Sequence, residues 1–355
     1  MSPSRLLLVV WDPSTGPHVD TAFRLADGVV DGTGWELSFV TGPVSDVFHY
    51  VEDLQPSAVV IAPSCSDEMG TSIGVPCVRF DLVAGPVDRT AEFVYQVSGL
   101  GLDGLPWALR AAMNACESPT AQRVRYGADE SQFIDVREPE SSPRASALLL
   151  HGGFYRSYWQ SFLMDPLAID LAKSGWRSFN VEFRRPDRHG WLATQEDLRL
   201  VVSQLKDHLV GPLVIIGHSV GGQLALQMGE WCDPTPDLCV SLTGVVDLVA
   251  AHDRGMGDGA VAAAMGSPVT NAMWYAGASP IAFADRKSEW LLIETEGDSW
   301  DLREMNMRLA ASTALRSPEL LMTPGDHFSV IDPQSEAWTT TLTRVSQMIG
   351  LSGEA

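Results

Sequence analysis

The sequence contains no run of about eighteen uninterrupted apolar residues, the length that a membrane-spanning helix needs. The apolar run from Leu6 to Trp11 is too short for a signal segment, because Asp12 and Pro13 follow it directly. We interpret this run as a first buried strand. The sequence also has no metal-ligand spacing, no P-loop and no G-x-G-x-x-G motif. We therefore expect neither a metal nor a cofactor, and no membrane partner.

Positive charge and cysteine are also scarce. The chain has 24 Lys and Arg against 45 Asp and Glu, a formal net charge of -21. This excess repels nucleic acid and anionic membranes and favours small neutral or cationic substrates. The cysteines are odd in number and lack metal-type spacing, so we expect reduced thiols in a cytoplasmic protein. They are Cys65, Cys77, Cys116, Cys232 and Cys239.

The length of 355 residues, with 45% hydrophobic content, favours two units. Up to about Asp81, short apolar runs alternate with amphipathic stretches, as in βαβ units around a parallel sheet. A longer helix is predicted from Asp88 to about Asn114. Glu117 to Thr120 then interrupt the periodicity. We predict a small N-terminal α/β domain of residues 1–115, serving as a lid, a gate or an oligomerisation element, and a second domain of residues 116–355.

The second domain again alternates strand and helix patterns. Its predicted strands are Arg123–Tyr126, Gln132–Arg137, Ala145–Leu150, Arg177–Phe183, Leu213–Ile216, Cys239–Leu242, Trp290–Glu294 and Glu319–Met322. Helices are predicted between them at Leu163–Ser174, Thr194–His208 and Val220–Trp231. This order predicts a mostly parallel sheet flanked by helices.

The strongest local signal is the G-x-S-x-G sequence from Gly217 to Gly221, which lies between a predicted strand and a predicted helix. This context is what a nucleophile elbow requires, because glycines permit the tight turn that presents the serine hydroxyl above the sheet. We therefore predict Ser219 as a nucleophile. The competing interpretation is an ordinary glycine-rich turn.

A second glycine motif, His151-Gly152-Gly153-Phe154, follows the predicted strand Ala145–Leu150. Glycines let a backbone N–H approach a developing oxyanion. We predict that either Gly153 or Phe154 supplies one donor and that Val220, the residue after the nucleophile, supplies the other.

The base and the acid are expected further along the chain. His327 follows the predicted strand Glu319–Met322 and is the best-placed base. The order serine, acid, histidine requires a carboxylate before it. Asp298, after the glycine turn that follows Trp290–Glu294, is our choice, with Asp301 and Asp247 as competitors. Its carboxylate is expected to orient the imidazole and stabilise the imidazolium.

The segment from Asp247 to Pro280 has the pattern of an irregular insertion rich in soft and aromatic side chains. Such residues either roof a pocket for an apolar or aromatic group or pack against the sheet edge. The candidate pocket residues are Tyr155, His218, Met273 and Trp274.

Residues from about 123 to 350 resemble the α/β-hydrolase superfamily, in particular its kynurenine-formamidase-like and carboxylesterase-like branch. The matching pieces, besides the two glycine motifs, are Asn180 to Arg185, Ala278 to Pro280 and Asp326 to Asp332. The resemblance implies the α/β-hydrolase fold with an additional small N-terminal α/β domain, hydrolysis through an acyl-enzyme, and Asp298 as the acid. Hormone-sensitive-lipase-like esterases carry His-Gly-Gly-Gly in this loop, whereas the motif in this chain has Phe154 as its last residue. This difference argues against an ester of a bulky tertiary alcohol as the substrate.

The sequence therefore predicts a serine hydrolase that cleaves a small carboxylic ester or an aryl amide or formamide. The alternative is a binding or scaffold protein that kept this fold without turnover. The substrate, the preference for ester or amide, and a possible homo-oligomer are left open.

Overall fold

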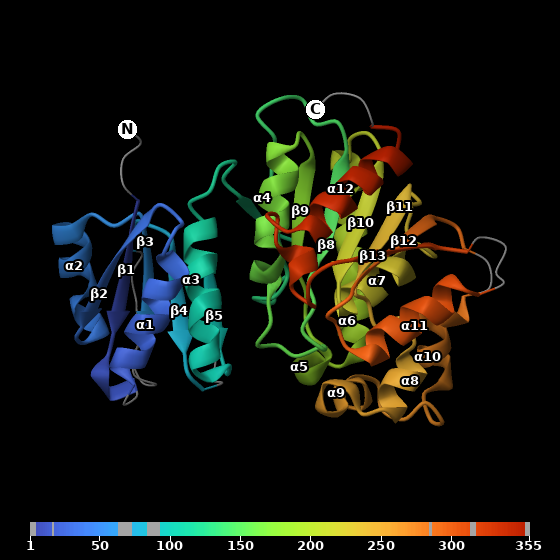
Figure 1. Ribbon diagram of the computed structural model, residues 1–355, viewed down its shortest axis with the longest axis horizontal. Helices are drawn as coiled ribbons and strands as arrows, with labels where there is room; N and C mark the ends of the chain where they lie inside the picture. The colour runs from blue at the N-terminus through green and yellow to red at the C-terminus, as the bar shows by residue number, and fades with distance from the viewer. Residues whose placement is uncertain are drawn as a thin grey trace. The chain divides into compact units, whose positions relative to one another are not determined.

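The computed structural model describes residues 5–15, 18–62, 73–83, 93–283, 286–312 and 317–351. The chain divides into two compact units, Met1–Thr120 and Ala121–Ala355. Each unit has its own sheet (Figure 1).

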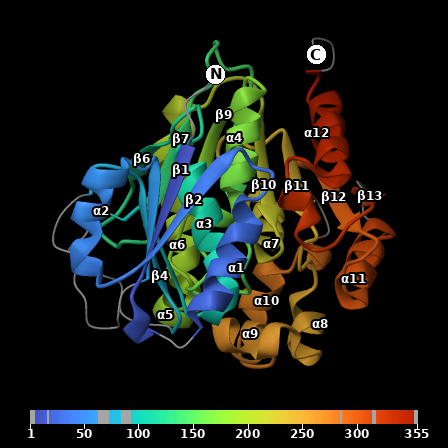
Figure 2. The same cartoon turned by 60° about the vertical axis from the view of Figure 1, so that its left-hand side comes forward.

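The N-terminal unit contains a parallel sheet in the order β2-β1-β3-β4-β5. Its strands are β1 Arg5–Trp11, β2 Trp35–Thr41, β3 Ala58–Ala62, β4 Cys77–Asp81 and β5 Tyr95–Ser98. Its helices are α1 Val19–Val30, α2 Val47–Leu54 and α3 Leu105–Asn114. Figure 2 shows α1 and α3 on one face of this sheet and α2 on the other. Alternate strand residues, such as Leu8 and Val10, pack toward α2 with Val47.

One prediction in this unit was wrong. The helix expected from Asp88 to Asn114 is replaced, where the structure describes it, by strand β5 and the shorter helix α3. Gly99 and Gly101 have φ of 78° and 57°. A right-handed helix cannot continue through this left-handed backbone, so α3 begins only after it. Residues 84–92 lie outside the described part of the chain.

The second unit contains an eight-stranded sheet in the order β13-β12-β11-β10-β8-β9-β7-β6. Among these strands β7 alone runs in the opposite direction, so its pairings with β6 and β9 are antiparallel and the other pairings are parallel. The strands are β6 Gln122–Arg125, β7 Phe133–Arg137, β8 Ser146–Leu150, β9 Arg177–Glu182, β10 Leu213–His218, β11 Leu238–Leu242, β12 Glu289–Thr295 and β13 Glu319–Thr323. Every strand predicted for this unit is present, within two residues at each end.

Helices cover both faces of the second sheet. On one face, α4 Asp165–Lys173 and α12 Glu336–Met348 are joined by Trp338, whose indole N–H donates to Asp170 at 2.7 Å. On the other face lie α6 Trp191–Leu205, α7 Val220–Met228 and α11 Trp300–Ala310. A short helix, α5 Pro186–His189, precedes α6.

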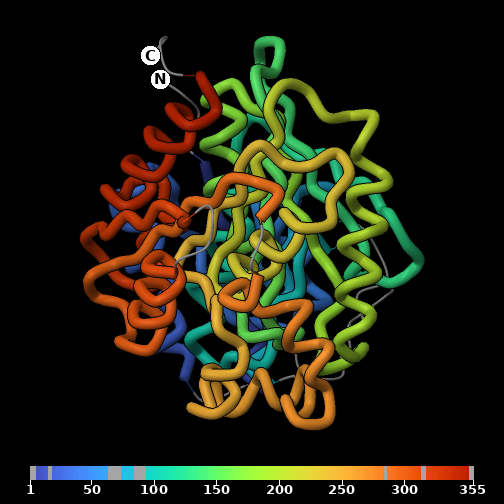
Figure 3. Tube along the Cα trace, turned by 90° about the vertical axis from the view of Figure 1, so that its right-hand side faces the viewer, coloured from blue at the N-terminus to red at the C-terminus, as the bar shows by residue number. Residues whose placement is uncertain are grey.

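The expected irregular insertion is helical. It forms α8 Leu248–Asp253, α9 Met256–Met265 and α10 Ala272–Ala278, which gather at one end of the unit (Figure 3, gold to orange). Buried side chains such as Val261 and Tyr275 tie these helices to the main core, which periodicity over such short segments does not reveal. No helix in the described part of the chain is long and apolar enough to cross a membrane.

Candidate active site

Several polar side chains follow the carboxyl ends of neighbouring strands in the second sheet. His151 follows β8, Ser219 follows β10, Thr243 follows β11, and Asp298 and His327 lie in the loops after β12 and β13. All five strands run parallel, so these residues meet at one edge of the sheet.

The turn at Ser219 has the geometry of a nucleophile elbow. Ser219 has φ 55° and ψ -120°, a conformation that costs a non-glycine residue about 1–3 kcal/mol. Its N–H donates to the carbonyl of Leu242 at 2.8 Å, which holds the turn against β11. A side chain at Gly217 or Gly221 would collide with nearby backbone carbonyls, so both positions require glycine.

Two backbone segments approach this serine. Helix α7 begins at Val220, and the first N–H groups of an α-helix have no intrahelical acceptor. The loop after β8 lies on the other side: a Cβ atom at Gly152 would be only 3.0 Å from Ser219 Cβ. Gly153 and Phe154 follow with φ of 112° and 47°. The start of α7 and the loop after β8 therefore both lie beside Ser219.

His327 contacts Asp298, the carboxylate that the sequence favours over Asp301 and Asp247. The distance from His327 Nδ1 to Asp298 Oδ2 is 2.7 Å, and the Asp298 side chain is 5% exposed. The competing carboxylates have other partners. Asp301 binds Arg254, and Asp247 accepts a hydrogen bond from the N–H of Ala250 at the start of α8.

His218 links the turn at Ser219 to the loop that carries His327. Its Nε2–H donates to the backbone carbonyl of His327 at 2.9 Å, and the two ring centroids are 4.7 Å apart. Burial, followed by the proximity of His327, lowers the pKa of His218 well below its usual value. His218 is therefore neutral at pH 7 and supports the His327 loop from within the protein.

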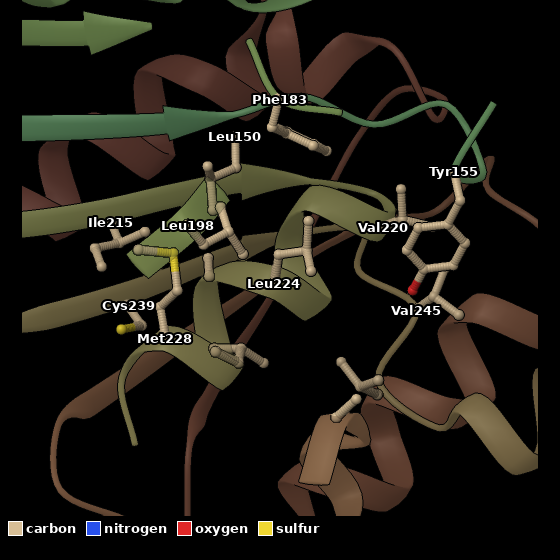
Figure 4. Packing of buried hydrophobic residues seen from close by; sticks show 14 of the residues in the cluster. Leu150, Tyr155, Phe183, Leu198, Ile215, Val220, Leu224, Met228, Cys239 and Val245 are labelled. Atoms are coloured by element: carbon tan, nitrogen blue, oxygen red, sulfur yellow. The ribbon is translucent and has the colours of Figure 1, made fainter. Parts of the chain in front are cut away.

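Tyr155 is a core residue, in contrast to its expected place in a pocket. It is 2% exposed, and its hydroxyl donates to Gln223 of α7 at 2.8 Å. Figure 4 shows its ring beside Val220 and Val245. Tyr155 thus anchors the loop after β8 to the helix that follows Ser219.

The other pocket candidates lie on α10. Met273 is 83% exposed and cannot wall a closed pocket, while Trp274 is partly buried against the core. The insertion approaches the site at α9 instead, where the Phe154 ring occupies the space that a side chain at Gly257 would need.

A buried polar network supports the loop after β8. His151 donates from Nδ1 to the carbonyl of Gly152 at 2.7 Å, and its ring stacks on Phe183. Burial lowers the pKa of His151 to about 3. Glu182 accepts hydrogen bonds from the Ser161 N–H and from Arg185, so this carboxylate is paired inside the protein.

Sequence reasoning missed two residues at this edge. Thr243 Oγ1 lies 3.1 Å from His327 Nδ1. Glu294, at the end of β12, is fully buried, and neither carboxyl oxygen has a hydrogen-bond partner in the described part of the chain. Burial, with a smaller contribution from Asp298 and an opposing one from Arg303, raises the pKa of Glu294 to about 9. Neither residue belongs to a motif that marks it in the sequence.

A group of three or more His, Cys, Asp or Glu side chains placed to hold a metal ion is absent among the described residues. The described cysteines are free thiols: Cys77, Cys232 and Cys239 are buried, and Cys116 is partly buried. Cys65 lies outside the described residues.

A curated relative is similar to one third of the chain. That relative is the kynurenine formamidase of Meyerozyma guilliermondii. It is 28% identical to this chain over 120 residues, which are 34% of this chain. The match spans 46% of that relative, about half of its length.

Solved esterases share the fold at low sequence identity. Esterase B from Lactobacillus rhamnosis has a TM-score of 0.56 and 15% identity, over 69% of this chain and 93% of that one. Esterase 2 from Thermogutta terrifontis has a TM-score of 0.53 and 17% identity, over 67% of this chain and 94% of that one. The family model described as the alpha/beta hydrolase family matches residues 147–351, more than half of the sequence. The chain belongs to the alpha/beta hydrolase family.

Proposed function

We propose that this protein is a serine hydrolase that cleaves a small carboxylic ester or an aryl formamide through an acyl-enzyme. The observation that carries the proposal is the 2.7 Å contact between His327 and Asp298 at the sheet edge where the strained Ser219 turn also lies. A nucleophile, a base and an orienting acid are the parts that this chemistry requires.

The reaction begins when Ser219 Oγ attacks the substrate carbonyl and His327 Nε2 takes the hydroxyl proton. Asp298 accepts the hydrogen bond from Nδ1–H and stabilises the imidazolium that forms. The N–H of Val220 and that of Gly153 or Phe154 stabilise the oxyanion. His327 then protonates the leaving alcohol or amine, and a water molecule, deprotonated by His327, releases the acid from Ser219.

Two features bear on the substrate. The partial match to a kynurenine formamidase favours an aryl formamide. The formal net charge of -21 favours a neutral or cationic molecule over an anion. The alternative is a protein that binds a ligand without turnover. Such a protein would not require the strained backbone turn at Ser219.

Hydrolysis of a panel of p-nitrophenyl esters and aryl formamides by wild type and Ser219→Ala tests the proposal. We expect turnover by the wild type that the substitution abolishes, and the preferred member of the panel identifies the substrate class. Equal turnover by both proteins would show that Ser219 is not the nucleophile, and binding of panel compounds without turnover would favour the non-catalytic alternative.

A further inference from the structure

Thr243 has an unusual backbone for its residue type. It follows β11 directly and has φ 47°, although it is β-branched and fully buried. Its N–H donates to the carbonyl of Ile293 in the neighbouring strand at 2.7 Å, which fixes this conformation. A left-handed φ is rare for β-branched residues and costs on the order of 1–3 kcal/mol. Glycine would occupy the position without this cost.

The side chain of Thr243 reaches the base. Thr243 Oγ1 is 3.1 Å from His327 Nδ1, while Asp298 Oδ2 is 2.7 Å from the same atom. An imidazole carries at most one hydrogen on Nδ1, which is present in the protonated ring and in one of the two neutral tautomers. When that hydrogen is directed at the carboxylate, the threonine oxygen can only act as a second acceptor for the same N–H.

The two acceptors come from different strands. Asp298 follows β12, whereas Thr243 follows β11, so the imidazole is held from two directions. The carboxylate supplies charge, and a single hydrogen bond to it leaves the ring free to pivot about that contact. A second acceptor on a buried, backbone-fixed residue restricts that rotation.

We propose that Thr243 is a positioning residue that fixes the ring orientation and tautomer of His327 through a shared Nδ1–H hydrogen bond. As a role in catalysis, this rests on the function proposed above. Thr243 makes no contact with substrate in this proposal, so its effect is expected on kcat and not on KM.

Three substitutions at Thr243 separate the effect of the hydroxyl group from the effects of the backbone conformation and of the side-chain shape. Thr243→Ser keeps the hydroxyl, Thr243→Val keeps the β-branched shape without it, and Thr243→Gly removes the hydroxyl while adopting the left-handed φ freely. Thr295→Val is the matched control, because Thr295 is also a buried threonine, at the end of β12, and its hydroxyl has no hydrogen-bond partner in the described part of the chain.

We expect Thr243→Val and Thr243→Gly to lower kcat by roughly tenfold to a hundredfold with KM unchanged, the effect of losing one hydrogen bond to a group that becomes charged. Thr243→Ser and Thr295→Val should stay within a few-fold of the wild type. Thermal unfolding of each variant separates this effect from misfolding. If Thr243→Gly folds and keeps wild-type kcat, the proposal is wrong.

A measurement without substrate separates this proposal from the proposed function. The side-chain 15N and 1H resonances of His327 report the tautomer and the hydrogen bonds at Nδ1. We expect them to shift in Thr243→Val and Thr243→Gly but not in Thr295→Val, whether or not the panel of esters and formamides is hydrolysed. Unchanged resonances in both Thr243 variants would overturn the proposal, whereas a shift without any turnover would contradict only the hydrolase function.

Discussion

Replacing Glu294 by Gln removes a proton-binding group from the interior of the second unit while keeping its shape. Glu294 is fully buried, and its pKa is raised from 4.5 to about 9, chiefly by burial. Gln resembles the protonated carboxyl group at every pH. The substitution therefore isolates the cost of keeping this group neutral.

The sign of the effect follows from proton binding. Between pH 4.5 and about 9, the unfolded chain has released the Glu294 proton and the folded protein still holds it. The folded state thus loses stability as the pH rises through this window. At 1.36 kcal/mol per pH unit, the cost reaches on the order of 6 kcal/mol above pH 9 and vanishes below pH 4.

Urea unfolding of wild type and Glu294→Gln at a series of pH values measures this cost. The free energy of unfolding of the variant, relative to the wild type, should rise steadily from pH 4.5 to pH 9 and then level off. The control is Glu296→Gln, because Glu296 is an exposed glutamate just after the same strand. A difference that stays flat across this range would refute the assignment of a neutral Glu294.

Two further predictions concern the acid and the elbow. Asp298→Asn should lower kcat by roughly a thousandfold or more, because the wrong imidazole tautomer would face Ser219; in steady-state assays Asp301→Asn should keep most of the activity, and the reverse pattern would make Asp301 the acid. Gly221→Ala should lower the melting temperature sharply or prevent folding, since its side chain would collide with a backbone carbonyl, whereas Gly277→Ala has open space and should be tolerated; equal melting temperatures for both would contradict the described turn.

Much of the second unit could be predicted because its strands are short buried runs separated by helical periodicity. Residues 213–216 form a continuous apolar run, and G-x-S-x-G after it leaves few alternatives to a strand, a tight turn and a helix. Because strands that alternate with helices run parallel, the loops after β12 and β13 lie at the same edge of the sheet as the turn at Ser219.

Other elements were hidden by competing signals. The Ala- and Leu-rich stretch before Asn114 favours a helix by composition, yet Tyr95 and Val97 pair with β4 and are buried. The helices α8 to α10 are short, and tertiary packing rather than periodicity stabilises them.

The site shows the same limit. Asp298 was predicted from its place after a strand, which the triad order requires. Thr243 and Glu294 belong to no motif, and their roles depend on contacts between strands that are distant in sequence. A threonine or glutamate at a strand end does not by itself indicate a position beside a histidine or an aspartate.

The most direct test of the central claim is covalent labelling with a fluorophosphonate, followed by peptide mapping with mass spectrometry. The reagent reacts with a serine whose hydroxyl is activated by a neighbouring base. We predict one adduct, on Ser219, that is absent in Ser219→Ala and strongly reduced in His327→Ala. An unlabelled wild-type protein, or an adduct that persists in Ser219→Ala, would contradict the assignment of Ser219 as the nucleophile.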